Sequence, residues 1–152
     1  MVRSIRLAEE QDRSILIRDY LQHLSPHIGE AERYALLHLQ VDRALLIEES
    51  GFLLGLATWG PREGIRLGVA QVTGMRIIAS RRQQGLGSEL FRALLSDMSA
   101  YYAERDAALR RLFLFSAEGT APFFERMGFQ QVAQLPALLG AGAGERLYLR
   151  EV

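Results

Sequence analysis

The chain has 152 residues, and its 18 basic side chains are all arginine, because the sequence contains neither lysine nor cysteine. The missing lysine excludes Schiff-base chemistry on a lysine amine and a phosphate loop that ends in Gly-Lys-Ser/Thr. The missing cysteine excludes disulfides, thiolate nucleophiles and zinc–thiolate clusters. It also agrees with a reducing compartment, so we expect a cytoplasmic protein.

The net charge limits the kinds of binding partner that we expect. Eighteen acidic side chains balance the arginines, which disfavours binding to nucleic acid or to an anionic membrane through a broad basic field. With 49% hydrophobic residues, the chain is typical of one globular domain, expected over residues 1–152. No apolar run approaches the ~18 residues that span a bilayer, so we expect neither a signal peptide nor a transmembrane segment.

The first half of the chain predicts a strand, two helices and a hairpin. In chain order these elements cover residues 4–7, 13–21, 31–39, 43–49 and 52–59. Asp12 is expected to cap the first helix, and Pro26 to break the chain between the two helices. Ser50-Gly51 separates the last two runs, which is a hairpin signal.

The second half predicts strands that alternate with helices. A β-rich stretch, a long amphipathic helix, a buried strand, a short helix and two closing strands are expected at residues 65–79, 86–102, 111–116, 122–127, 129–135 and 146–150. Paired strands followed by strand–helix–strand units indicate a mixed α/β or α+β sheet.

Residues 82–87, Arg-Gln-Gln-Gly-Leu-Gly, lie between a strand and the long helix. A helix start offers unpaired N–H groups, glycine lets an anion approach the backbone, and Arg82 adds a charge-assisted hydrogen bond. This combination predicts a pyrophosphate cradle. The alternative is that Gly85 and Gly87 only permit a sharp turn and close packing of the helix on the strand.

In this context Arg82-x-x-Gly85-x-Gly87 resembles the acetyl-coenzyme A signature of the GNAT-family N-acetyltransferases. A dinucleotide-binding loop fits less well, because its third glycine would fall at Leu90. Residues 5–12 resemble the family's opening strand and helix cap, and residues 123–129 its C-terminal motif. The resemblance implies a GNAT-type mixed, mostly antiparallel central sheet flanked by helices. It also implies transfer of acetyl from acetyl-coenzyme A to a primary amine of a small molecule or peptide.

The resemblance also implies which residues bind the coenzyme. The loop amides that would hold the pyrophosphate belong to Arg82, Gln83, Gln84, Gly85, Leu86, Gly87 and Ser88. The main chain of Met75, Ile77 and Ile78 would pair with the pantetheine arm, and an amide near Met75 would polarise the thioester carbonyl.

The catalytic acid and base are not identified by the resemblance. Phe124 stands where many members carry the tyrosine thought to protonate the departing thiolate, and Ala117 replaces a frequent asparagine. Glu118 is a candidate base, although it also reads as an exposed acid ahead of a helix. The remaining candidates are Ser116 as a donor, and Glu63 and His27 as bases.

The acceptor pocket of this fold would map to residues 24–29, 59–63 and 135–139, with Arg62 as a clamp for an acidic substrate. Trp59 would either wall that pocket or close the core. His23 and His27 have a metal-binding spacing, but Pro26 separates them, so no metal site is expected.

Two other functions are kept as alternatives to the enzyme. They are a non-catalytic acyl-coenzyme A-binding module, suggested by Phe124, and an unrelated nucleotide-binding protein. Without cysteine, an enzyme would transfer acetyl directly in a ternary complex. A homodimer is a further expectation, since homodimers are common in the resembled family.

Overall fold

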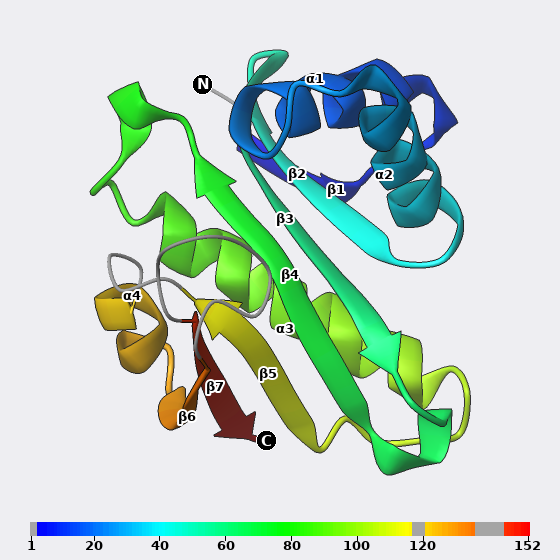
Figure 1. The fold of residues 1–152 in the computed structure, drawn as a ribbon, viewed down its shortest axis with the longest axis vertical. Coiled ribbons are helices and arrows are strands. Elements are labelled where there is room, and N and C mark those ends of the chain that lie inside the picture. The colour runs from blue at the N-terminus through cyan, green and yellow to red at the C-terminus, as the bar shows by residue number, and fades with distance from the viewer. Residues whose placement is uncertain (1–2, 117–120, 136–144) are drawn as a thin grey trace. The chain divides into compact units, whose positions relative to one another are not determined.

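The computed structural model describes residues 3–116, 121–135 and 145–152 (Figure 1). Its elements are β1 (Arg3–Leu7), η1 (Glu10–Asp12), α1 (Arg13–His23), α2 (Ile28–Gln40), β2 (Arg43–Glu49), β3 (Phe52–Arg62), η2 (Ile65–Leu67), β4 (Val69–Ile77), η3 (Ala79–Arg81), α3 (Leu86–Ala103), β5 (Arg111–Ser116), α4 (Ala121–Arg126), β6 (Gln130–Leu135) and β7 (Glu145–Glu151). None of the helices in these residues is both long enough and apolar enough to span a membrane.

The strands of the described residues follow the hydrogen-bonded order β1-β2-β3-β4-β5-β7-β6. The pairs β1–β2, β2–β3, β5–β7 and β6–β7 are antiparallel, and β4–β5 is parallel. The expected fold class, a mixed and mostly antiparallel sheet with helices, is therefore confirmed.

The chain forms two compact units. The first contains the residues up to Gly60 and Gly74–Leu94, and the second contains Pro61–Thr73 and the residues from Leu95 onward. β3, β4 and α3 each continue from one unit into the other. The single domain expected over residues 1–152 stays a prediction.

In the first unit, α1 and α2 pack on β2 and β3. Their common core consists of Leu16, Ala35, Ala44, Leu46 and Leu56, none of which is more than 2% exposed. Burying such side chains contributes about 1.5–3 kcal/mol for each large one. The two helices therefore rest on an apolar sheet face, as their sequence periodicity predicts.

The hairpin predicted at Ser50-Gly51 is confirmed. Glu49 pairs with Phe52, which leaves two residues in the loop, and both have positive φ angles, 52° at Ser50 and 83° at Gly51. Two positive φ angles define a type I′ turn, whose twist matches that of the strands it joins.

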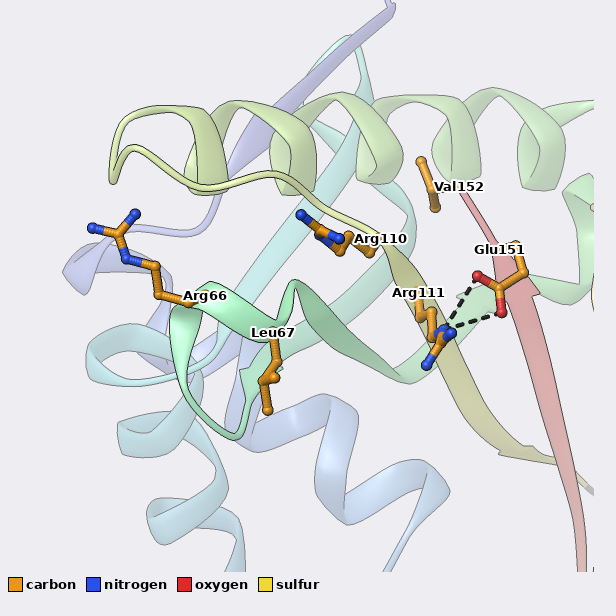
Figure 2. A pocket seen from close by; sticks show the side chains of 6 residues that line it. All are labelled: Arg66, Leu67, Arg110, Arg111, Glu151 and Val152. Atoms are coloured by element: carbon orange, nitrogen blue, oxygen red, sulfur yellow. Dashed lines mark hydrogen bonds and ion pairs between the residues drawn. The ribbon is translucent and has the colours of Figure 1, made fainter.

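The second unit contains the β5–β7–β6 ladder and the first part of β4. β5 pairs along its whole length with β7, from Arg111↔Glu151 to Ser116↔Arg146, and the Arg111 and Glu151 side chains form an ion pair (Figure 2). Tyr102 is fully buried and donates a hydrogen bond of 2.6 Å to the carbonyl of Val69. This bond fixes the C-terminal part of α3 to the start of β4.

Two expectations about the strands need correction. The strand expected from residue 65 begins at Val69, because η2 occupies Ile65–Leu67 and Gly68 follows in a left-handed conformation with φ 67°. A Cβ at Gly68 would lie 2.2 Å from the carbonyl oxygen of Ala108, so this close approach requires glycine. In addition, β3 extends to Arg62 rather than ending at Trp59.

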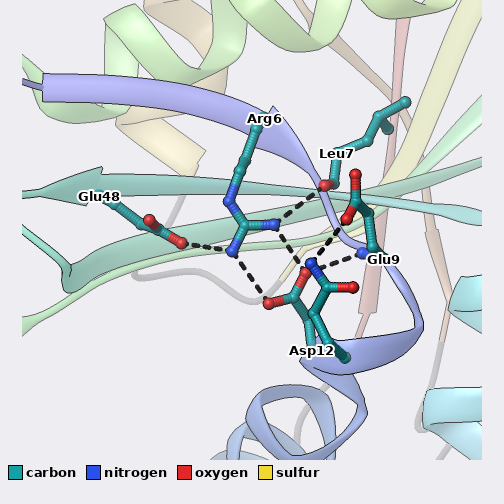
Figure 3. A network of polar contacts seen from close by, with 6 residues as sticks. Arg6, Leu7, Glu9, Asp12 and Glu48 are labelled. Carbon is teal, nitrogen blue, oxygen red and sulfur yellow. Dashed lines mark hydrogen bonds and ion pairs between the residues drawn. The ribbon is translucent and has the colours of Figure 1, made fainter.

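Asp12 occupies the N-cap position of α1, but its carboxylate makes no capping bond to that helix. It instead accepts hydrogen bonds from Arg6 Nη1 at 2.7 Å and from the Glu9 amide at 2.8 Å, while Arg6 also pairs with Glu48 (Figure 3). The sequence thus predicted the N-cap position of Asp12 correctly, but its carboxylate binds Arg6 and the Glu9 amide instead of the amides of α1.

Candidate functional site

The loop between β4 and α3 has a backbone that ordinary residues adopt rarely. After η3, Gln83 has φ 62° and Gly85 has φ 77°, and α3 begins at Leu86. A Cβ added at Gly85 would meet no atom within 4 Å. Close packing of helix on strand therefore does not explain Gly85, whereas its positive φ and the open space beside it do.

The start of α3 presents unpaired amides. The first helical hydrogen bond runs from the Glu89 amide to the Gly85 carbonyl at 3.1 Å. The amides of Leu86, Gly87 and Ser88 precede it and donate no hydrogen bond to another described residue. Such amides carry the positive end of the helix dipole and form an anion-binding site.

Arg81 anchors the loop to β2. Its Nη1 lies 2.7 Å from Oε2 of Glu49, and its Nε donates to Oε1 of Gln84 at 2.9 Å. The hydrogen bond from Arg81 holds the pKa of Glu49 below its usual range, although burial opposes this effect. Arg81 thus ties the turn that leads to the unpaired amides to Glu49 on β2 and binds Gln84 within this turn.

Arg82 is exposed, and its Nε donates a hydrogen bond of 3.2 Å to the carbonyl of Ile77. Its terminal Nη groups form neither a hydrogen bond nor an ion pair with another described residue. Arg82 can therefore keep its bond to Ile77 and still bind an anion beside the loop.

The main chain at the end of β4 is only partly available to a ligand. The amide of Ile78 donates to the carbonyl of Leu54 at 2.9 Å, and its carbonyl accepts from Arg81. The expected pairing of the Ile78 main chain with the pantetheine arm stays a prediction, although its amide is bound to Leu54 in this structure. Met75 and Ile77, both half-buried, keep the expected role as a prediction.

A second polar cluster, formed by Asp19, Tyr34 and Arg76, was not predicted. Asp19 on α1 is 8% exposed and accepts hydrogen bonds from Arg76 Nε at 2.8 Å, from Arg76 Nη2, and from the Tyr34 hydroxyl at 3.0 Å. Arg76 also donates to the Tyr34 oxygen at 3.1 Å. The cluster ties α1 and α2 to β4 beside Met75 and Ile77.

This cluster does not supply a base. Burial, followed by the charge of Asp19, raises the pKa of Tyr34 well above its ordinary value. Burial alone would lower the pKa of Arg76, but its hydrogen bond to Asp19 raises it. With three hydrogen bonds accepted by the Asp19 carboxylate, the groups are mutually satisfied, and their role is to hold the structure.

The remaining catalytic candidates are scattered. Glu118 lies outside the described residues, as does Ala117. Phe124 on α4 is 9% exposed and makes edge-to-face contacts with Phe123 at 5.2 Å and Phe129 at 5.8 Å between ring centroids. Its ring is part of an aromatic core, and Ser116 is buried at the end of β5.

The expected acceptor residues also differ in their surroundings. Trp59 is fully buried and belongs to the core, and Arg62 donates from Nε to Oε1 of Gln71 at 2.9 Å. His27 and Glu63 are exposed. α1 ends at His23 and α2 begins after His27, and no group of three metal-binding side chains occurs in the described residues.

Comparison with known proteins identifies the family. The sequence profile described as the Acetyltransferase (GNAT) family matches residues 10–129, which is most of the chain. The chain belongs to the GNAT acetyltransferase family. The matched range of this GNAT protein contains residues 82–87, which lead into α3, and their role as the coenzyme loop stays a prediction. No protein with a curated description matches the chain significantly.

Solved structures share the GNAT fold. A GNAT-family acetyltransferase from Desulfovibrio desulfuricans has 23% sequence identity and a TM-score of 0.74, with 99% of each chain covered. The ribosomal-protein-S18-alanine N-acetyltransferase from Escherichia coli has 14% identity and a TM-score of 0.77, covering 99% of this chain and 94% of that chain. An aminoglycoside 6'-N-acetyltransferase complexed with coenzyme A has 17% identity and a TM-score of 0.75, covering 99% and 97%.

Proposed function

We propose that this GNAT acetyltransferase uses acetyl-coenzyme A to acetylate a primary amine of a small molecule or peptide, by direct attack in a ternary complex. One observation carries the proposal: the amides of Leu86, Gly87 and Ser88 are unpaired, and a Cβ added at the neighbouring Gly85 would meet no atom within 4 Å. A pyrophosphate group satisfies both the amides and the helix dipole, and Arg82 adds a charge-assisted bond.

The β4 main chain would receive the rest of the coenzyme. The ladder between β4 and β5 covers three residue pairs and ends at Gln71↔Phe113, although β4 continues to Ile77. An extended pantetheine arm can pair with main-chain groups at Met75 and Ile77 as an added strand would. An amide in this stretch would then polarise the thioester carbonyl.

The chemistry follows from what the chain lacks. Without cysteine, no acetyl group can be held on an enzyme thiol, so the amine attacks the thioester carbon directly. The amine loses a proton, and coenzyme A departs as a thiolate, which is a stable leaving group. No described residue is assigned as acid or base, and Glu118 stays the proposed base.

An amine acceptor is supported by related proteins. The names of the neighbours describe acetylation of spermidine, of an aminoglycoside and of a ribosomal-protein alanine, all of which present amines. The test is release of coenzyme A thiol from acetyl-coenzyme A in the presence of polyamines, aminoglycosides, amino acids and peptides. Release that exceeds the amine-free rate with one of them supports the proposal, and no increase with any would contradict it.

The aromatic packing of Phe124 favours one alternative, a non-catalytic acyl-coenzyme A-binding module, because no phenol is present at this position. Calorimetry combined with the thiol-release assay separates the two functions. Both predict saturable coenzyme binding, and only the enzyme consumes acetyl-coenzyme A. A cytoplasmic location and a homodimer are further predictions, to be tested by cell fractionation and by sedimentation.

A further inference from the structure

The second unit contains a basic hollow that has no part in the proposed acetyl transfer. Its volume is about 440 Å³, and it is lined by Arg66, Leu67, Arg110, Arg111, Glu151 and Val152 (Figure 2). A hollow of this size is within the range of small-molecule sites. Three arginines and one glutamate belong to this lining, so its side chains carry a net charge of +2.

The guanidinium groups in the hollow are not neutralised equally. Arg111 pairs through Nε with both oxygens of Glu151, at 3.0 and 3.2 Å. Arg66 donates one hydrogen bond, of 2.9 Å, to the carbonyl of Asp106. The guanidinium of Arg110 forms neither a hydrogen bond nor an ion pair with any residue that the structure describes. In Figure 2, Arg110 lies between Arg66 and Arg111.

The backbone that supports these arginines is fixed. The carbonyl of Gly68 accepts hydrogen bonds from the amides of Arg110 at 2.8 Å and Arg111 at 3.1 Å, and the Val152 amide donates to the Arg110 carbonyl at 2.9 Å. Gly68 also lies close to Ala108, so that a Cβ added there would stand 2.2 Å from the Ala108 carbonyl oxygen. The backbone of Arg110 and Arg111 is thus held in place before any ligand arrives, which lowers the entropic cost of binding.

We infer that this hollow binds a small molecule that carries a phosphate group on an apolar body. The positively charged lining attracts a phosphate, and guanidinium groups bind its oxygens in bidentate fashion. Leu67 and Val152 are 58% and 64% exposed and provide apolar walls for the rest of the ligand. The inference is independent of acetyl transfer, because its residues and those of the 82–88 loop do not overlap.

The test is an NMR titration with phenyl phosphate, inorganic phosphate and benzoate. The signals to follow are the Nε–Hε groups of Arg66 and Arg110 and the amides of Gly68 and Val152. We expect saturable shifts, with phenyl phosphate binding more tightly than inorganic phosphate, because only the former uses the apolar walls. Benzoate should bind more weakly than phenyl phosphate, since it carries one charge.

Two variants complete the test. Arg66→Gln combined with Arg110→Gln should weaken phenyl phosphate binding by about tenfold or more, since two charge-assisted contacts are lost. Arg18→Gln combined with Arg33→Gln, the same charge change at exposed positions of α1 and α2, should leave affinity within about twofold. Equal affinity of the double variant, shifts confined to Leu86–Ser88, or no saturation by about 50 mM would overturn the inference.

Discussion

The ion pair between Asp19 and Arg76 is expected to be the most sensitive polar contact of the first unit. Replacing Asp19 by asparagine removes the negative charge but keeps the side-chain size, and leaves the Arg76 guanidinium without its carboxylate. Loss of one partner of a fully buried pair costs about 3–5 kcal/mol. Arg76 is 23% exposed, so water recovers part of this, and we expect a loss of about 2–3 kcal/mol.

Thermal unfolding followed by circular dichroism measures this effect. For a chain of this length, about 2–3 kcal/mol corresponds to a midpoint lowered by about 5–10 °C. Replacing both Asp19 and Arg76 by leucine should recover much of the loss, because no unpaired charge remains. A midpoint lowered by less than about 2 °C, or a double variant as unstable as the sum of the single ones, would refute this reasoning.

The control is the exposed pair of Glu10 and Arg13, which lies three residues apart at the start of α1. The side chains are 66% and 42% exposed, so replacing Glu10 by glutamine should change the unfolding free energy by less than about 0.5 kcal/mol. The comparison separates burial of the ion pair from the mere loss of a charge near α1.

Three further predictions follow from the loops and the pKa shifts. The pKa of Asp12 is lowered in the folded chain, so its contribution to stability is complete above about pH 4 and is lost as the pH falls through the pKa of the folded state. Asp12→Asn should therefore make the free energy of unfolding depend less on pH in this window. Gly85→Ala should weaken coenzyme binding in calorimetry and lower the free energy of unfolding by about 1 kcal/mol, because φ at Gly85 is 77°. Gly29→Ala in α2, where an added Cβ meets no atom within 4 Å, should not lower the free energy of unfolding, and equal effects of the two substitutions would contradict this reasoning. Glu49→Gln should loosen Arg81 and raise the KM for acetyl-coenzyme A about three- to tenfold with kcat nearly unchanged; an unchanged KM would remove Glu49 from the positioning of the loop.

Local signals in the sequence predicted most of the fold. Ser50-Gly51 specified its hairpin because a two-residue loop with positive φ angles favours these residues, and Pro26 separated α1 from α2. The candidate coenzyme loop was predicted from the order of strand, turn and long helix around residues 82–87. Each of these features depends on residues that are close in the chain.

The charged contacts that support the site could not be predicted in this way. Arg81 and Glu49 are 32 residues apart in the sequence, and Arg76 and Asp19 are 57 apart. With 18 arginines and 18 acidic residues, the sequence allows many pairings, and strand order and helix packing select among them. The bound amide of Ile78 has the same origin, because its acceptor belongs to a neighbouring segment.

The central claim is that the amides at the start of α3 bind the pyrophosphate of acetyl-coenzyme A. Calorimetric titration with acetyl-coenzyme A and with S-acetylpantetheine, which lacks the pyrophosphate and the nucleotide, tests it most directly. The account predicts saturable binding of acetyl-coenzyme A and an affinity for S-acetylpantetheine lower by about a hundredfold or more, since several charge-assisted contacts are missing. Equal affinity for the two compounds, or no binding of acetyl-coenzyme A, would contradict it.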